Sequence, residues 1–326
     1  MSERVLTVEG LSTRFPGSDG PVAVVEDVSF EIDRGEVLAL VGESGCGKSM
    51  TAFSLLRLVP RPGRIAARRI EICGRDVLSL PVPEMRQVRG REAAMIFQEP
   101  MTSLNPVQTA GAQVVEAIRL HERIDTGAAR RRTVELFDRV GIPDPDARFD
   151  AYPHQLSGGM KQRVMIAMAL SSHPKLLIAD EPTTALDVTI QAQILDLLRE
   201  LQRESGTSIL LITHDLGIVN ELADRVSVMY AARLVEEGRR ETILGAARHP
   251  YTQGLLRSIP GLARRGEPLA EIPGVVPAPE EWPPGCHFAG RCERALECCA
   301  TTRPDETRLA DEHVVSCHVV AREASR

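Results

Sequence analysis

The sequence predicts an α/β fold built on a parallel sheet, and three observations favour this class. Apolar runs of strand length occupy residues 36–41, 176–181 and 208–213. Helical spacing follows the first two runs, at 50–56 and 190–200. Each run ends in a glycine-rich or polar segment, and open α/β sheets place their ligands at the carboxyl ends of the strands. We therefore expect the functional site at that edge of the sheet.

The composition is that of a large globular chain with a modest negative charge. The 326 residues suffice for an α/β core and a smaller second unit, and the net charge of −6 argues against a general nucleic-acid or anionic-membrane binder. The N-terminus lacks an apolar signal core, and no apolar stretch approaches the roughly 18 residues that a membrane span needs. We expect a soluble, cytoplasmic protein.

The N-terminal part is expected to form a small antiparallel β layer. Strand-like runs lie at 5–8, 22–25 and 28–32, with a turn rich in Pro, Gly, Ser and Asp at 16–21. Phe15 is a candidate for stacking on a purine ring, and ordinary packing is the alternative.

The stretch after the first apolar run fits the phosphate-binding pattern G-x-x-x-x-G-K-[ST], between a strand and a helix as a P-loop requires. Spaced glycines let backbone N–H groups point into one concavity, to which the helix adds its positive end. Lys48 is expected to reach the outer phosphates and Ser49 to bind Mg²⁺. A turn that binds nothing is the alternative. The expected nucleotide-binding residues here are Gly42, Glu43, Ser44, Gly45, Cys46, Gly47, Lys48, Ser49 and Met50.

A helical insertion is expected after a strand at 94–97. Gln98 follows this strand, and its amide is a candidate ligand for Mg²⁺ or an orienting group for a water, with a solvated side chain as the alternative. The apolar loop at 99–106 is a candidate docking surface. Helical spacing then appears at 108–120 and 128–140.

A second anion site is expected at the start of the apolar helix at 164–170. Ser157 is a suitable N-cap, and Gly158 and Gly159 leave backbone N–H groups open at the helix start. An ordinary capped helix is the alternative.

Two carboxylates end the apolar run at 176–181. Asp180 is expected to hold Mg²⁺ through its water shell, and Glu181 to polarise the water that attacks a γ-phosphate. A solvated acidic turn is the alternative. Asp187 closes the next turn, and His214 follows the last apolar run, where it would sense the γ-phosphate or position the water unless it is structural.

Taken together, these motifs resemble the ATP-binding subunits of ABC transporters over roughly residues 5–260. The resemblance implies a P-loop NTPase (ABC ATPase) domain at 1–260, with a helical subdomain at about 99–172 and a small Cys-rich extension at 261–326. The motifs that carry it are the P-loop, Gln98, LSGGM at 156–160, LLIADE at 176–181, Ala185-Leu186-Asp187 and His214.

The resemblance also implies that two such domains close head to tail around ATP and Mg²⁺. Each ATP would lie between the P-loop of one chain and the signature helix of the other. The implied catalytic residues are Lys48, Glu181 and His214. The remaining implied ATP contacts outside the P-loop are Phe15, Gln98, Ser157, Gly158, Gly159 and Asp187, and the implied Mg²⁺ ligands are Ser49, Gln98 and Asp180.

Within this family the chain resembles the D-type subunit of oligopeptide/dipeptide (or nickel) importers, on the stretches 99–106, 160–170 and 249–256. That resemblance implies a similar F-type ATPase, two membrane permeases and an extracytoplasmic solute-binding protein as partners, with the chain at the cytoplasmic face of the membrane and no nucleic acid bound. The alternatives are the ATPase of a nickel or other small-solute importer, and a soluble ABC ATPase outside transport.

Five of the seven cysteines lie after residue 285, behind a proline-rich linker. In a reducing compartment this clustering suggests a metal rather than disulfides. The spacing lacks a C-x-x-C knuckle, which favours a [4Fe-4S] cluster over Zn²⁺, and similar tails hold such clusters in some peptide importers. A zinc site that uses His287 or His318 stays open. The expected cluster ligands are Cys286, Cys292, Cys299 and Cys317, with Cys298 as the alternative to Cys299.

Overall fold

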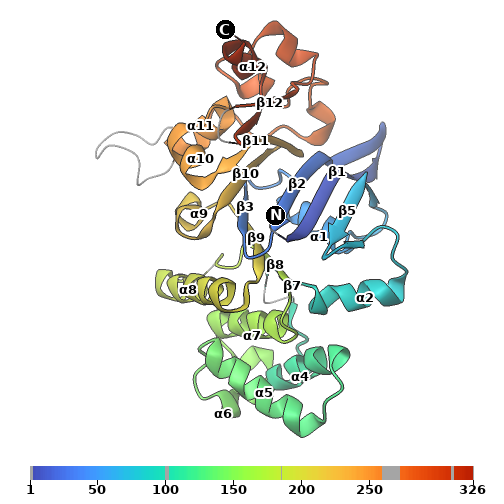
Figure 1. Ribbon diagram of the computed structural model, residues 1–326, viewed down its shortest axis with the longest axis vertical. Helices are drawn as coiled ribbons and strands as arrows, with labels where there is room; N and C mark the ends of the chain where they lie inside the picture. The colour runs from blue at the N-terminus through green and yellow to red at the C-terminus, as the bar shows by residue number, and fades with distance from the viewer. Residues whose placement is uncertain (1–2, 100–102, 185, 259–271, 310–311, 326) are drawn as a thin grey trace. The chain divides into compact units, whose positions relative to one another are not determined.

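A computed structural model describes residues 3–99, 103–184, 186–258, 272–309 and 312–325 (Figure 1). The chain divides into two compact units, and each contains segments from distant parts of the sequence. No helix in the described ranges is both long and apolar enough to cross a membrane. The first unit comprises Met1–Leu6, Ile32–Glu36 and Glu71–Leu211, and the second comprises Thr7–Glu31, Val37–Ile70 and Ile212–Arg326.

The N-terminal strands form a long hairpin within the expected antiparallel layer, but the division of its strands differs from the prediction. β1 (Arg4–Gly17) and β2 (Gly20–Asp33) are hydrogen-bonded neighbours, and the turn shrinks to residues 18–19. The runs at 22–25 and 28–32 belong to the single strand β2. Asp27 accommodates the irregularity between these runs, because it adopts a φ of 49° and donates its N–H to Ser12 Oγ at 3.0 Å.

Short strands accompany this hairpin. β4 (Arg64–Ala66) pairs antiparallel with β1, with Thr13 opposite Ile65. β5 (Arg69–Ile72) pairs antiparallel with β6 (Arg75–Asp76). These pairings confirm the predicted antiparallel layer.

The second unit contains five strands in the order β12-β13-β11-β10-β3. β3 and β10 are parallel, and the other pairs are antiparallel. One apolar core covers this sheet and includes the fully buried rings of Tyr230 and Tyr251. The strands are β3 (Val37–Val41), β10 (Arg225–Tyr230), β11 (Arg233–Arg239), β12 (Glu306–Arg308) and β13 (Val314–Ser316). The helices are α1 (Lys48–Leu55), α9 (Leu216–Leu222), α10 (Arg240–Ala246), α11 (Pro250–Arg257) and α12 (His318–Ala324).

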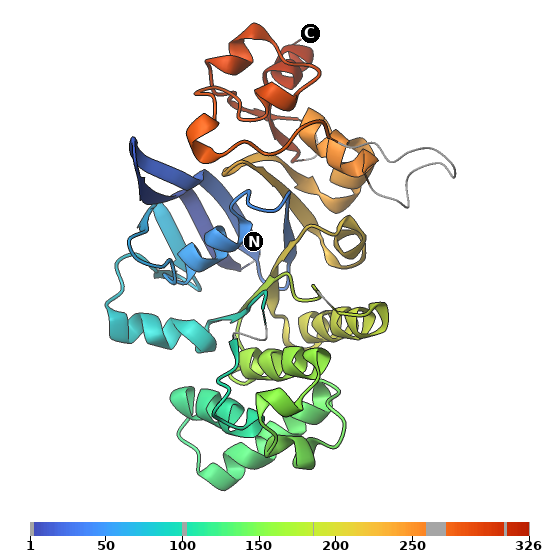
Figure 2. The same ribbon diagram turned by 180° about the vertical axis from the view of Figure 1, so that it is seen from behind.

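The first unit contains the parallel pair β7 (Ala93–Ile96) and β8 (Leu176–Asp180), and β9 (Ser208–Thr213) begins beside β8. The expected helical insertion is present and appears green in Figure 1 and Figure 2. A further helix that the pattern does not predict carries only two buried side chains, Met85 and Val88. The helices are α2 (Val82–Arg91), α4 (Ala110–His121), α5 (Thr126–Arg139), α6 (Pro145–Phe149), α7 (Gly158–Leu170) and α8 (Val188–Ser205).

The Cys-rich segment has little regular structure of its own and is attached to the second unit. Its 3-10 turns at Pro279–Glu281, Ala289–Arg291 and Glu297–Ala300 lie between irregular stretches. β13 pairs with β11, and Phe288 enters the core of the second unit. The segment also has a small apolar cluster of its own, around Val315, Cys317 and Val320, so it combines a minor core with burial against the larger one.

We expect Phe137→Ala to destabilise the protein by about 3–5 kcal/mol, because the Phe137 ring in α5 is fully buried and its loss leaves a cavity. Urea unfolding measures the change. Leu120→Ala is the matched control, since Leu120 in α4 is 68% exposed and its loss should cost less than about 0.5 kcal/mol. Equal effects of the two substitutions would contradict the assignment of this core.

Candidate functional site

The P-loop is shaped by glycines whose backbone conformations and surroundings exclude a side chain. Gly42 has a φ of 154°, and a Cβ there would lie 2.1 Å from the carbonyl oxygen of Met229. Gly47, the N-cap of α1, has a φ of 110°, and its Cβ would lie 2.4 Å from the carbonyl oxygen of Val24. The loop therefore packs directly on neighbouring backbone, as a backbone cradle for phosphate requires.

Lys48 lies across the P-loop at its base. Its Nζ donates to the carbonyl oxygens of Gly42 at 2.7 Å and Glu43 at 3.0 Å, and the residue is 6% exposed. The ammonium group is thus held among the loop carbonyls at the start of α1. A point charge in this position suits the recognition of the outer phosphates of a nucleotide.

The other P-loop side chains differ in exposure. Ser44 and Gly45 are exposed, whereas Ser49 and Met50, in the first turn of α1, are half-buried. Cys46 is buried, and burial raises the pKa of its thiol, so the thiol stays protonated and packs as a small apolar group. The loop thus offers backbone and hydroxyl groups to a ligand rather than a reactive thiolate.

Phe15, the predicted adenine-stacking residue, lies on β1 and is half-buried. Its ring packs against Gly63, where a Cβ would lie 2.7 Å from Phe15 Cζ. Part of the Phe15 ring is therefore already packed against the protein at Gly63. The stacking role stays a prediction.

Asp180 is the last residue of β8 in the first unit and Glu181 directly follows it, with 1% and 9% of their surfaces exposed. Glu181 has a φ of 48°, an unusual conformation for a residue other than glycine and one that occurs preferentially at functional sites. Thr184 Oγ1 donates to Glu181 Oε2 at 2.6 Å and fixes the carboxylate. Gln98 follows the neighbouring parallel strand β7 and is exposed. The structure therefore brings the amide and both carboxylates to the carboxyl ends of adjacent parallel strands, where open α/β sheets bind ligands.

The predicted signature segment begins α7 as expected. Ser157 is the N-cap and accepts the N–H of Met160 at 3.3 Å. A Cβ at Gly158 would meet nothing within 4 Å, and Gly159 has only Ile190 nearby, at 3.4 Å from its Cβ position. The first turn of α7 is thus open on the described chain, so an anion can approach its N–H groups.

Asp187 and His214 occupy cap and strand-end positions. Asp187 is the exposed N-cap of α8 and accepts the N–H of Ile190 at 2.9 Å. His214 directly follows β9 and is exposed. A capping role accounts for Asp187 structurally, so its contact with ATP stays a prediction, as does the role of His214. Ala185 and residues 100–102 of the predicted docking loop lie outside the described residues.

The cysteines of the C-terminal segment differ in burial. Cys299 and Cys317 are buried, Cys286 and Cys292 are half-buried, and Cys298 is exposed. Burial and, to a smaller extent, the nearby thiols of Cys299, Cys317 and Cys292 together raise the pKa of Cys286 to about 11. The thiol of Cys298 in turn acts on that of Cys299, so all five cysteines of the segment belong to one group of neighbouring thiols. Nevertheless, no group of three or more His, Cys, Asp or Glu side chains among the described residues is arranged as a metal-ion site.

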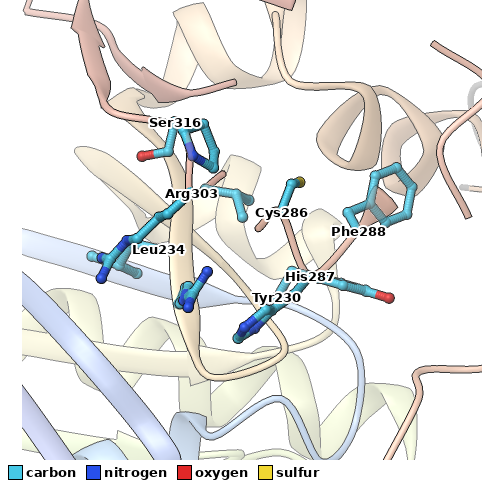
Figure 3. Close-up of a pocket in the computed structure, with 10 residues that line it drawn as sticks. Tyr230, Leu234, Cys286, His287, Phe288, Arg303 and Ser316 are labelled. Atoms are coloured by element: carbon cyan, nitrogen blue, oxygen red, sulfur yellow. The ribbon is translucent and has the colours of Figure 1, made fainter. Parts of the chain in front are cut away.

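The two histidines considered for a zinc site have other partners. His287 Nδ1 lies 2.6 Å from the carbonyl oxygen of Ala231, and its Nε2 lies 3.8 Å from Glu26 Oε2. His318 Nε2 lies 2.8 Å from the carbonyl oxygen of Thr302. Figure 3 shows His287 beside Cys286 in the wall of a cavity of about 30 Å³, which also includes Arg303 and Ser316. One ring nitrogen of each histidine is therefore engaged with a backbone carbonyl oxygen.

Three residues that the sequence patterns do not identify hold the site in place. Gln162 in α7 donates from Nε2 to the carbonyl oxygen of Pro182 at 2.7 Å, directly after Glu181. Tyr251 Oη accepts the N–H of Glu43 at 2.9 Å, and Arg291 pairs with the carboxylate of Glu43. No local pattern predicts these long-range contacts.

Two protein families match parts of the chain. The ABC transporter family matches residues 25–184, and the family described as "Oligopeptide/dipeptide transporter, C-terminal region" matches residues 235–299. The chain is 48% identical to the dipeptide transport ATP-binding protein of Escherichia coli K12, over 99% of this chain and 98% of that protein. It is also 48% identical to the oligopeptide transport ATP-binding protein of Bacillus subtilis, over 99% of this chain and 91% of that protein.

Among solved structures, the chain is similar to a dimeric ATP-binding cassette in a post-hydrolysis state, bound to ADP and Pi. The TM-score is 0.65 at 25% identity, over 72% of this chain and 98% of that chain. The matches in sequence extend along almost the whole chain, through the P-loop, the carboxylates and the Cys-rich segment. The chain therefore belongs to the ABC transporter family of ATPases, in the branch whose members carry the oligopeptide/dipeptide transporter C-terminal region.

Proposed function

We propose that the chain is the ATP-hydrolysing motor subunit of an ABC importer for peptides. The observation that carries this proposal is the near full-length similarity to dipeptide and oligopeptide transport ATP-binding proteins, including their C-terminal region. ATP is the substrate, and hydrolysis supplies the free energy for uptake through other subunits.

Within this proposal, the P-loop residues 42–49 bind the phosphates, and Glu181 acts as general base. A water oxygen attacks the γ-phosphorus while the bond to the β–γ bridging oxygen breaks, and Glu181 accepts the proton of the water. His214 would hold this water or contact the γ-phosphate. The left-handed backbone of Glu181 and its hydrogen bond from Thr184 support a fixed carboxylate.

The proposed Mg²⁺ ligands are Ser49, Gln98 and Asp180. A hydroxyl, an amide oxygen and a carboxylate are the hard oxygen donors that Mg²⁺ prefers, so the residues fit the ion. When bound, Mg²⁺ would neutralise the charge that develops on the phosphate oxygens. Asp180 is almost fully buried, which suits a carboxylate that acts on a cation through a fixed geometry.

The second anion site, at Ser157 to Gly159, is proposed to serve the ATP of a partner subunit. No neighbouring side chain covers Gly158 on the described chain, so a nucleotide bound to another subunit could reach this helix start. The proposed partners are an F-type ATPase, two permeases and an extracytoplasmic solute-binding protein. This assembly would place the chain at the cytoplasmic face of the membrane.

For the C-terminal region, residues 261–326, we propose a [4Fe-4S] cluster bound by Cys286, Cys292, Cys299 and Cys317. The closeness of the thiols in this segment supports a shared site, and a cluster spans more space than a single ion, so its ligands lie further apart. Cys298 is the less suitable ligand because it is exposed. Thiols with a raised pKa must lose protons to bind, so binding should weaken as the pH falls.

If these roles are correct, Glu181→Gln should reduce ATP turnover by about 100-fold or more and keep ATP affinity, because it removes only the base. Lys48→Ala should instead lose ATP binding. Nucleotide titration and phosphate release measure the two effects, with Glu200→Gln on the exposed face of α8 as the control. Equal loss of ATP binding in both variants would contradict the assignment.

The shared-site arrangement predicts that the isolated chain hydrolyses ATP weakly. Addition of the F-type ATPase and the permeases should raise the rate per chain, because each site would then gain its signature helix. Coupled light scattering and activity measurements test this expectation. A proven monomer with full activity at every concentration would exclude the shared site.

Protein purified without oxygen should be brown and contain iron and inorganic sulfide. Substitution of Cys286, Cys292, Cys299 or Cys317 by Ser should remove the colour, since each supplies one thiolate. Cys298→Ser is the matched control and should keep the cluster. A colourless anaerobic preparation with one tightly bound zinc ion and no sulfide would refute the cluster.

A further inference from the structure

Two contacts from outside the P-loop converge on one of its residues, Glu43. Its backbone N–H donates to Tyr251 Oη at 2.9 Å. Its carboxylate accepts two parallel hydrogen bonds from Arg291, Nη1 to Oε2 at 2.8 Å and Nη2 to Oε1 at 3.1 Å. Both the backbone and the side chain of this residue are therefore held from the C-terminal third of the chain.

The side chain of Arg291 is largely buried and makes further hydrogen bonds. Its side chain is 7% exposed, whereas the Glu43 side chain is 30% exposed. Besides Glu43, the guanidinium donates to Tyr230 Oη at 3.4 Å and to the carbonyl oxygens of Pro273 at 2.8 Å and of Ile272 and Gly274, each at 3.3 Å. Because these hydrogen bonds fix the planar guanidinium group, it can hold the Glu43 carboxylate in one orientation.

The charge of Glu43 explains why such a pair matters for a phosphate site. A carboxylate in a phosphate-binding loop repels a polyphosphate unless a cation neutralises it or turns it away. The positive charge of Arg291 neutralises the Glu43 carboxylate. Its two hydrogen bonds also hold that carboxylate pointed toward the guanidinium group. Because the Arg291 side chain is buried, water and salt screen its charge less than that of an exposed arginine.

Tyr251, which contacts the backbone of Glu43, is itself packed against the segment that contains Arg291. Phe288 packs against Tyr251, with ring centroids 5.4 Å apart, and against Tyr230, at 5.1 Å. Phe288 and Arg291 both lie in the seven-residue stretch that starts at Cys286 and ends at Cys292. One short stretch, with a cysteine at each end, therefore supports Glu43 by both routes.

We propose that Arg291 is a positioning residue for ATP, through which the stretch from Cys286 to Cys292 sets the nucleotide affinity of the P-loop. The inference rests on the proposed role of residues 42–49 as the phosphate site. Arg291 acts on ATP only through Glu43. Displacement of this stretch, by any change at its two cysteines, would lower ATP affinity without altering a residue that contacts the nucleotide.

The test is a double-mutant cycle on the full-length chain, with MgATP binding measured by calorimetric titration. Arg291→Met should weaken binding about tenfold, because it leaves the Glu43 carboxylate unpaired. Arg291→Lys, which keeps the charge without the paired hydrogen bonds, should recover part of this loss. Glu43→Gln should cost less than Arg291→Met, and the double variant Glu43→Gln, Arg291→Met should resemble Glu43→Gln alone.

A matched control lies three residues along the same segment. Arg294 pairs with Glu323 and is 40% exposed, so Arg294→Met should leave ATP affinity unchanged. A second readout is the alkylation rate of Cys46 by N-ethylmaleimide, mapped by mass spectrometry. Cys46 is 1% exposed in this structure. If Arg291→Met loosens the P-loop, Cys46 should be alkylated faster, and MgATP should slow the alkylation again.

The outcomes separate this inference from the proposed function. Failure of the wild-type chain to bind MgATP would overturn the phosphate site itself. Binding by the wild type, together with affinities of Arg291→Met and Arg291→Lys within twofold of Arg294→Met, would overturn only the role of Arg291. Should Arg291→Met fail to fold, as judged by thermal melting, an unchanged affinity and Cys46 alkylation rate in Arg291→Lys would likewise overturn it.

Discussion

The second unit depends on the close approach of the P-loop to two neighbouring backbone segments. Gly42 and Gly47 lie so near the carbonyl oxygens of Met229 and Val24 that no side chain fits at either position. This contact fixes the end of β3 and the start of α1, and with them the ammonium group of Lys48. A loop held in this way is preorganised, so less conformational entropy is lost when a ligand binds.

The sequence predicted the parts of the site that depend on local chemistry. The P-loop, the cap at Ser157 and the carboxylates after β8 all follow from short patterns, because glycine, capping and strand-end residues act on their immediate neighbours. Elements with weak local signals were harder to predict. β2 forms one strand because Asp27 accommodates the irregularity, and α2 has too few apolar residues to stand out.

The contacts that support the site were not predictable, because they join residues far apart in the sequence. The pairing of Glu43 with Arg291 spans 248 positions, and nothing near either residue indicates its partner. Gln162 is similar, since its hydrogen bond to Pro182 depends on how α7 packs rather than on its own sequence context. Charge and hydrogen-bonding capacity are visible in a sequence, but the geometry that joins two groups is a property of the fold.

The pairing of β13 with β11 has a consequence for the solution behaviour of the protein. Without the C-terminal strands, β11 would be an edge strand with a row of unpaired backbone groups, which can recruit strands from other molecules. β13 covers that edge, and β12 becomes the new border. β12 has only three residues, Glu306, Thr307 and Arg308, and short, charged edges resist strand addition. The C-terminal strands thus replace the seven-residue border of β11 with one of three residues.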